Sequence, residues 1–213
     1  MKRTPEAEVD KIRQVAASAV QAAMAKHLRN ALAAAFISSL AASSVFAATS
    51  SCEPEILRAA ERHGVPPGIL YAVGLAETGR KGSLQPYALN IEGKAVFARS
   101  IDDAARAFEK ARRDGAKLID LGCMQINHYY HADQFRSVRQ MLDPRQNVEY
   151  AARFLAQLKQ RHGTWSMAIA RYHAGPNNDP AQRRYVCRVI ANLAATGFGK
   201  WTPEARKLCN RQL

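Results

Sequence analysis

Glu77 is the only charged residue in an otherwise apolar segment, residues 66–79. Apolar surroundings disfavour the charged form of a carboxyl group, so its pKa rises. A glutamate in such a place can hold a proton near neutral pH, donate it and take it back, which is general acid and base chemistry. The alternative is a glutamate that ends a helix in solvent, where most glutamates lie.

Two amide side chains occur in a second apolar segment. Gln125 and Asn127 alternate with Met124 and Ile126, and residues 122–126 are predicted to form a short strand. On a strand the two amides face the same side, where they could hydrogen-bond the N-acetyl and hydroxyl groups of a sugar. Ordinary polarity at a strand edge is the alternative.

Tyr172 is expected on the apolar face of a helix, with a hydroxyl group that can reach a polar partner. A tyrosine so placed is more often a core residue than a ligand-binding one. The neighbouring His173 is expected to point elsewhere and to be exposed.

The spacing of apolar residues and the residues at segment ends predict the elements that position these side chains. The segment around Glu77 is predicted to be a buried helix that starts at the prolines at 66 and 67 and stops near Gly79. Other helices are expected over residues 53–63, 100–114, 148–162, 164–174, 179–193 and after Thr202. Residues 88–98 are predicted to form a hairpin around Glu92-Gly93 that shares a small sheet with the strand 122–126. The fold class is therefore α+β, predominantly α, in one domain.

The N-terminal region has the pattern of an export signal. Residues 30–47 form an apolar run without charge, after two basic residues and with small residues near Ala47. This predicts a signal peptide over residues 1–47 and a periplasmic domain over residues 48–213. The run is short, so no stable membrane span is expected after processing; a buried or anchoring helix is the alternative. Translation is expected to start at Met24, unless the residues before it form a genuine amphipathic extension.

The four cysteines all follow the expected cleavage site. An even number in an exported chain predicts two disulfides, and the absence of a Cys-x-x-Cys pair argues against a zinc site. Cys187 is expected to pair with Cys209, because short helices flanking a glycine-containing loop could bring them together. Cys52 and Cys123 are then either paired with each other or both free.

The composition narrows the class of partner. The chain has 213 residues, 47% of them hydrophobic, which suits one folded domain and not a disordered chain. Its net charge of +13 suits a polyanion, either nucleic acid or an anionic cell wall. The export signal and the absence of a clustered basic and aromatic stripe argue against nucleic acid.

Four segments occur in an order that resembles the soluble lytic transglycosylases of the lysozyme superfamily. They are Ala-Glu-Thr (76–78), Asp-Leu-Gly-Cys-Met-Gln-Ile-Asn (120–127), Asp-Pro-Arg-Gln-Asn-Val (143–148) and Arg-Tyr-His-Ala-Gly (171–175). Pro-Tyr-Ala-Leu-Asn (86–90) makes the subgroup that accompanies secretion and conjugation machineries look closest. The resemblance covers residues 52–178.

The resemblance implies a lysozyme-like fold with a small antiparallel sheet and Glu77 as the sole catalytic acid and base. The substrate-binding residues expected from it and from the amide pattern are Thr78, Met124, Gln125, Asn127 and Tyr172. This chain departs from the family pattern at four of the matched positions. They are Thr78 for Ser, Cys123 for Leu, Arg171 for Ala and His173 for Asn, and the last leaves the contacts at 173 open.

The implied reaction cuts the glycan strands of peptidoglycan without water. Glu77 would protonate the glycosidic oxygen and then take the proton of the muramic acid O6 hydroxyl, which closes on C1. No metal and no organic cofactor is required.

Three other functions stay open. Ordinary glycosidases use two carboxylates, and Asp120 is the nearby candidate for a second one in a lysozyme-like hydrolase. A non-catalytic peptidoglycan-binding component of a secretion or conjugation system is another possibility, and a basic nucleic-acid binder is the last.

Overall fold

The computed structural model of the protein describes residues 51–80, 82–175 and 177–209. The predicted signal peptide therefore lies outside the described residues. The described elements, in chain order, are α2 (Cys52–His63), α3 (Pro67–Thr78), β1 (Ala88–Ile91), β2 (Lys94–Phe97), α4 (Ile101–Arg113), β3 (Ile119–Leu121), β4 (Ile126–Asn127), α5 (His128–His131), the short 3₁₀-helix η1 (Ala132–Gln134), α6 (Val138–Leu142), α7 (Pro144–His162), α8 (Trp165–His173), α9 (Asp179–Ala195) and α10 (Pro203–Cys209). The predicted class, mostly helical with a small antiparallel sheet, is confirmed.

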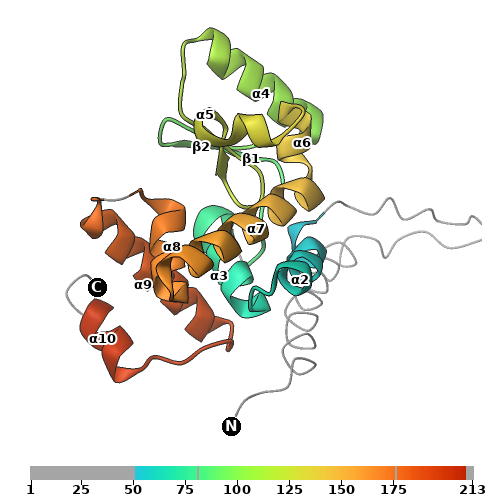
Figure 1. Ribbon diagram of the computed structural model, residues 1–213. Helices are drawn as coiled ribbons and strands as arrows, with labels where there is room; N and C mark the ends of the chain where they lie inside the picture. Colours follow the sequence, from blue (N-terminus) through green and yellow to red (C-terminus); the bar gives the residue numbers. More distant parts are fainter. Residues whose placement is uncertain (1–50, 81, 176, 210–213) are drawn as a thin grey trace, which may run out of the picture.

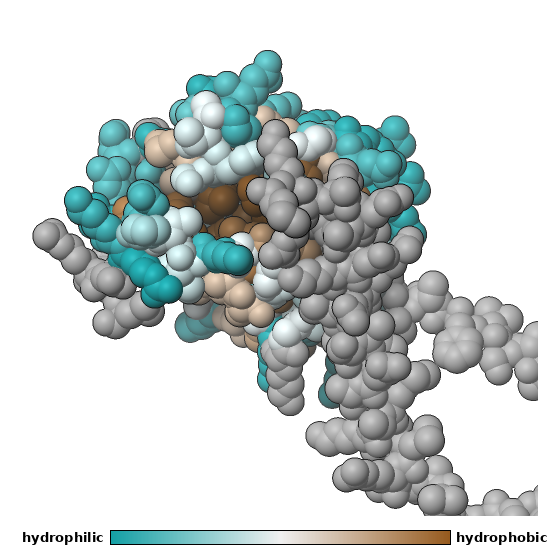
Figure 2. Space-filling view, turned by 90° about the horizontal axis from the view of Figure 1, so that it is seen from below, coloured by the Kyte–Doolittle hydropathy of each residue, from teal (hydrophilic) through white to brown (hydrophobic). Residues whose placement is uncertain are grey.

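The uncharged segment before Glu77 forms α3, which is buried along most of its length, as its composition predicted. It packs against α2 and α9. Figure 1 shows α3 and α7 in the middle of the molecule, with the sheet and α4 beyond one end and α8, α9 and α10 to the other side. On the face seen in Figure 2, apolar residues gather in the centre, with hydrophilic residues at the edges that are not drawn in grey. The buried apolar residues of α3 belong to one apolar core cluster, which supports the helix where its last turn presents Glu77.

The sheet has four antiparallel strands in the order β2-β1-β3-β4. The predicted hairpin is confirmed: Glu92 and Gly93 join β1 to β2 with φ angles of 49° and 90°, as a tight hairpin turn requires. The register places Asn90 opposite Asp120, and Asp120 opposite Asn127. Three polar side chains therefore stand in one row across three strands.

The strand predicted over residues 122–126 is wrong. Residues 122–125 form the turn between β3 and β4, and only Ile126 belongs to a strand. Gly122 has a φ of 78°, and a Cβ atom there would lie 2.6 Å from the Asn147 side chain. Gln125 also has a positive φ, 47°. The alternation of apolar and polar residues suggested a strand, but the backbone turns tightly because it wraps around Asn147.

Asn147 on α7 holds this turn at both ends and is fully buried. Its Oδ1 accepts a hydrogen bond from the Met124 backbone N–H at 2.8 Å. Its Nδ2 donates to the carbonyl oxygens of Leu121 and Met141, each at 2.8 Å. One side chain thus satisfies three buried backbone groups that a turn would otherwise leave without partners.

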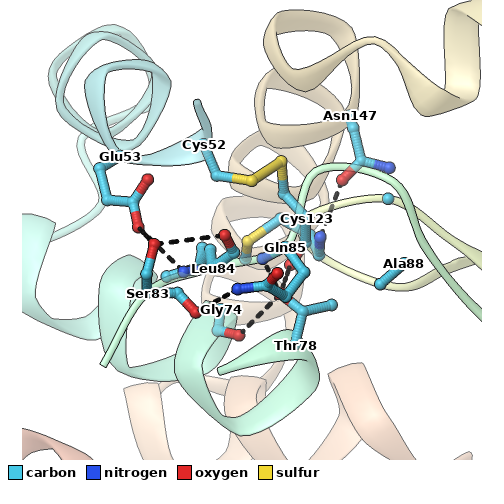
Figure 3. The surroundings of a disulfide bond; sticks show 12 residues. Cys52, Glu53, Gly74, Thr78, Ser83, Leu84, Gln85, Ala88, Cys123 and Asn147 are labelled. Atoms are coloured by element: carbon cyan, nitrogen blue, oxygen red, sulfur yellow. Dashed lines mark hydrogen bonds between the residues drawn. A yellow bond between two sulfur atoms is a disulfide. The ribbon is translucent and has the colours of Figure 1, made fainter. Parts of the chain in front are cut away.

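Two disulfides cross-link the chain. The predicted Cys187–Cys209 bond is confirmed, and Cys52 pairs with Cys123, one of the two arrangements left open by the sequence. The Cys52–Cys123 bond ties the start of α2 to the turn after β3. Thr78 and Asn147 hydrogen-bond the same turn from two sides (Figure 3). Disulfides persist in oxidising compartments, so the pair indicates an extracytoplasmic location. No helix in the described ranges is long and apolar enough to cross a membrane.

Replacing Cys187 and Cys209 together by serine should lower the free energy of unfolding by about 3 kcal/mol, since their bond closes a loop with a sequence separation of 22. The bond joins α9 to α10, so the loss should appear as a lower midpoint in urea unfolding followed by circular dichroism. Oxidised wild type, unfolded in the same urea series, is the control. An unchanged midpoint would show that α10 docks without it.

Candidate active site

A cleft of about 850 Å³ is lined by the end of α3, by the strands of the sheet and by residues of α8 and α9. It contains Glu77 from the end of α3 and Asp120 from β3. Tyr172 and His173 close it from the other side. Segments far apart in the sequence therefore meet at one concave surface with a mixed polar and apolar lining.

Glu77 lies in the last turn of α3, and its side chain is only 12% exposed. Its Oε1 accepts a hydrogen bond of 2.6 Å from the Tyr185 hydroxyl. Burial raises the pKa of Glu77 to about 7; the charge of Asp120 adds to the rise, while the Tyr185 hydrogen bond and Arg188 oppose it. The carboxyl group is thus poised to give up and recover a proton near neutral pH.

His173 lies beside this carboxyl group, contrary to the expectation that it points elsewhere. Its ring stacks on Tyr185 with centroids 4.1 Å apart and planes at 1°, and its Nδ1 lies 4.0 Å from Glu77 Oε1. The side chain is also exposed, as expected. The packing of α8 on α9 turns the ring toward the cleft. Burial, together with Arg188 and Arg184, lowers the pKa of His173, so the neutral ring is favoured.

Asp120 occupies the middle of the polar row on the sheet. Its two carboxylate oxygens accept hydrogen bonds from Asn90 Nδ2 at 3.0 Å and from Asn127 Nδ2 at 2.7 Å. Burial raises the pKa of Asp120, and these two hydrogen bonds oppose the rise. The oxygen of the Asn90 amide is buried and has no hydrogen-bond partner among the described residues. The row therefore fixes a carboxyl group at the sheet side of the cleft.

The other predicted site residues divide into those that reach the cleft and one that does not. Thr78, Gln125, Asn127 and Tyr172 line it. Met124 is fully buried and is not among the lining residues, so it contributes through its backbone carbonyl, which accepts the Tyr172 hydroxyl at 2.8 Å.

Thr78 and Gln125 line the cleft and also form hydrogen bonds that stabilise the turn between β3 and β4. The Thr78 hydroxyl donates to the Cys123 carbonyl at 2.8 Å. Gln125 Nε2 donates to the carbonyls of Gly122 and Ala88 at 2.9 and 3.2 Å. The amide pair expected on one strand face is thus split, because Gln125 stabilises the turn while Asn127 belongs to the polar row.

Tyr185 and Arg188 were not among the predicted site residues. Tyr185 is buried on α9 and bonds Glu77, and Arg188 lines the cleft and donates to the Ala76 carbonyl at 3.4 Å. The signal that could have pointed to Tyr185 is a hydroxyl on the apolar face of a helix, the same signal that singled out Tyr172. Across the described part of the chain, no group of three or more His, Cys, Asp or Glu side chains gathers where it could hold a metal ion.

Glu77→Gln should make the protein more stable at pH 8, because the raised pKa means that the fold disfavours the charged carboxylate. The protonated form dominates below about pH 4.5 in both states, so the two proteins should be nearly equal there; the stability of wild type falls as pH rises to about 7. The difference at pH 8 should approach about 3 kcal/mol. Urea unfolding at both pH values measures it, and a difference that grows toward low pH would contradict the assignment.

The family model described as Transglycosylase SLT domain matches residues 55–191, which include the cleft residues from α3 to α9. No curated protein and no solved structure matches the chain.

Proposed function

Because this chain belongs to the transglycosylase SLT domain family, we propose that it is a lytic transglycosylase of peptidoglycan with Glu77 as its acid and its base. The family membership supports peptidoglycan as the substrate. The observation that carries the assignment of Glu77 is its burial in the cleft with a pKa raised to about 7. An enzyme that uses one group for both proton transfers needs such a value near neutral pH.

The reaction follows from one carboxyl group acting twice. Protonated Glu77 donates its proton to the oxygen between MurNAc and GlcNAc, and the bond from that oxygen to C1 of MurNAc breaks. The Tyr185 hydroxyl, which donates to Oε1, stabilises the carboxylate that remains. This carboxylate then takes the proton of the MurNAc O6 hydroxyl while O6 bonds to C1. The product end is a 1,6-anhydro sugar, no water enters, and Glu77 regains its proton.

A lysozyme-like hydrolase is the second candidate, and the presence of Asp120 in the same cleft favours it. Retaining and inverting hydrolases both need a second carboxylate near the sugar ring. Two amide donors hold the Asp120 carboxylate in place, as in a hydrolase whose second carboxylate stabilises the charged sugar ring. A wall-binding component without catalysis is the third candidate.

Digestion of purified sacculi should yield muropeptides with anhydro ends. Each should be lighter than the corresponding hydrolysed muropeptide by one water, about 18 Da, because O6 replaces water as the nucleophile. Mass spectrometry of the unreduced digest measures the difference, with a digest by a known hydrolase as the control. Reducing ends without an anhydro form would assign the protein to the hydrolases, and intact sacculi after incubation with folded protein would favour the wall-binding component.

We also propose that the protein is exported to the periplasm through residues 1–47 and opens the wall for a trans-envelope secretion or conjugation apparatus. The two disulfides support an oxidising compartment. The resemblance of residues 86–90 to the subgroup that accompanies such machineries supports the second part. Envelope protein that begins at Ala48 would support cleavage after Ala47, whereas intact protein in the cytoplasm would contradict export.

A further inference from the structure

Arg171 on α8 has guanidinium nitrogens that no described residue pairs. Its Nε and Nη1 atoms are buried and have no hydrogen-bond partner among the described residues. The residue also lines the cleft that contains Glu77. Buried donor atoms without a hydrogen-bond partner are unfavourable in a folded protein. We propose that Arg171 forms an anion-binding subsite in the cleft, which takes a carboxylate of the substrate.

Neither carboxyl group of the cleft pairs with Arg171, so its guanidinium group remains free to bind an anion. Glu77 accepts the Tyr185 hydroxyl, and Asp120 accepts two amide donors, so neither carboxyl group pairs with Arg171. Arg188 lines the same cleft and adds a second positive charge. A negatively charged substituent that enters the cleft therefore meets two cations, Arg171 and Arg188.

The chemistry of the substrate identifies the anion, and this step rests on the proposed function. Peptidoglycan strands alternate GlcNAc with MurNAc, and their sugar rings are neutral. Negative charge comes from the lactyl group of MurNAc, either as its own carboxylate when no peptide is attached or as the carboxylates of the attached peptide. A planar guanidinium matches a carboxylate. The subsite would therefore recognise muramic acid units and not a neutral chitin-like glycan.

Binding measured in a Glu77→Gln background tests the subsite without turnover. The probes are a peptide-free MurNAc-GlcNAc oligosaccharide, the same oligosaccharide carrying its peptides, and a chitooligosaccharide of equal length. Adding Arg171→Met should weaken binding of at least one muramic acid probe by about tenfold and leave the chitooligosaccharide unchanged. Arg171→Lys should lie between, because it keeps the charge and loses the planar fork. Arg183→Met, an exposed arginine outside the cleft, is the matched control and should change nothing.

The two sources of carboxylate give different results. Weaker binding of the peptide-free probe identifies the lactyl carboxylate, and weaker binding of the peptide-bearing probe alone identifies a peptide carboxylate. Thermal unfolding distinguishes the subsite from a structural role. Replacing an arginine that stabilises the fold should lower the melting temperature, whereas Arg171→Met should not, because it removes an unpaired charge. A lower melting temperature, or an equal loss for all three probes, would overturn the subsite. Absence of anhydro products with Arg171-dependent binding intact would instead overturn the proposed reaction.

Discussion

Glu77→Gln should reduce the release of anhydro-muropeptides by about a thousandfold or more. Gln has the size of Glu and can still accept the Tyr185 hydroxyl through its amide oxygen, so the cleft should keep its shape. It has no titratable proton, and the reaction loses its acid and its base at once. Turbidity of a sacculus suspension gives the rate, and mass spectrometry gives the product.

Asp120→Asn is the matched control for this experiment, since it changes a second carboxyl group of the same cleft to its amide. If the sugar O6 is the nucleophile, Asp120→Asn should cost far less activity than Glu77→Gln. Equal inactivation of both variants would assign a catalytic role to Asp120 and favour the hydrolase. Full activity of Glu77→Gln would remove Glu77 from the chemistry altogether.

Asn147→Ala should destabilise the protein by about 3–5 kcal/mol. The substitution leaves the Met124 N–H and the carbonyls of Leu121 and Met141 buried without their partner. The turn between β3 and β4 then loses the contact that shapes it, and the backbone carbonyl that holds Tyr172 shifts with it. Urea unfolding at fixed pH measures the loss of stability.

Asn178→Ala is the control for the loss of an asparagine. Asn178 is exposed and precedes α9, where its side chain makes no capping hydrogen bond. Its replacement should change stability by less than about 0.5 kcal/mol. If Asn147→Ala were equally mild, water would have to satisfy the three backbone groups, and the turn would not depend on α7.

The position of Glu77 could be predicted from the sequence because it depends only on neighbouring residues. A segment with one charge and helix signals at both ends gives a buried helix, whatever packs around it. The Cys187–Cys209 bond could be predicted for a similar reason, because the loop that it closes is short and holds few elements. The hairpin at Glu92-Gly93 could be predicted from Gly93, which takes a positive φ without steric cost, and from the apolar residues on either side of the pair.

The features that the sequence did not reveal depend on residues far apart in the chain. The turn before β4 resembled a strand because its conformation is set by Asn147, which lies 23 residues beyond Met124. Tyr185 bonds a glutamate 108 residues earlier, and no local pattern relates the two. The direction of His173 follows from its stacking on the same tyrosine. Tertiary packing therefore completes a site whose acid is visible in the sequence.

The order of the disulfides has a consequence for how the chain becomes oxidised. Cys52 pairs with Cys123 and Cys187 with Cys209, so the bonds are consecutive, neither nested nor crossed. A chain that emerges from its N-terminus presents each cysteine directly before or after its partner. An oxidant that joins thiols in order of appearance then produces the native bonds without the slow reshuffling that crossed patterns need. In that order, the Cys52–Cys123 loop that carries Glu77 would close before α9, which carries Tyr185, is linked to α10.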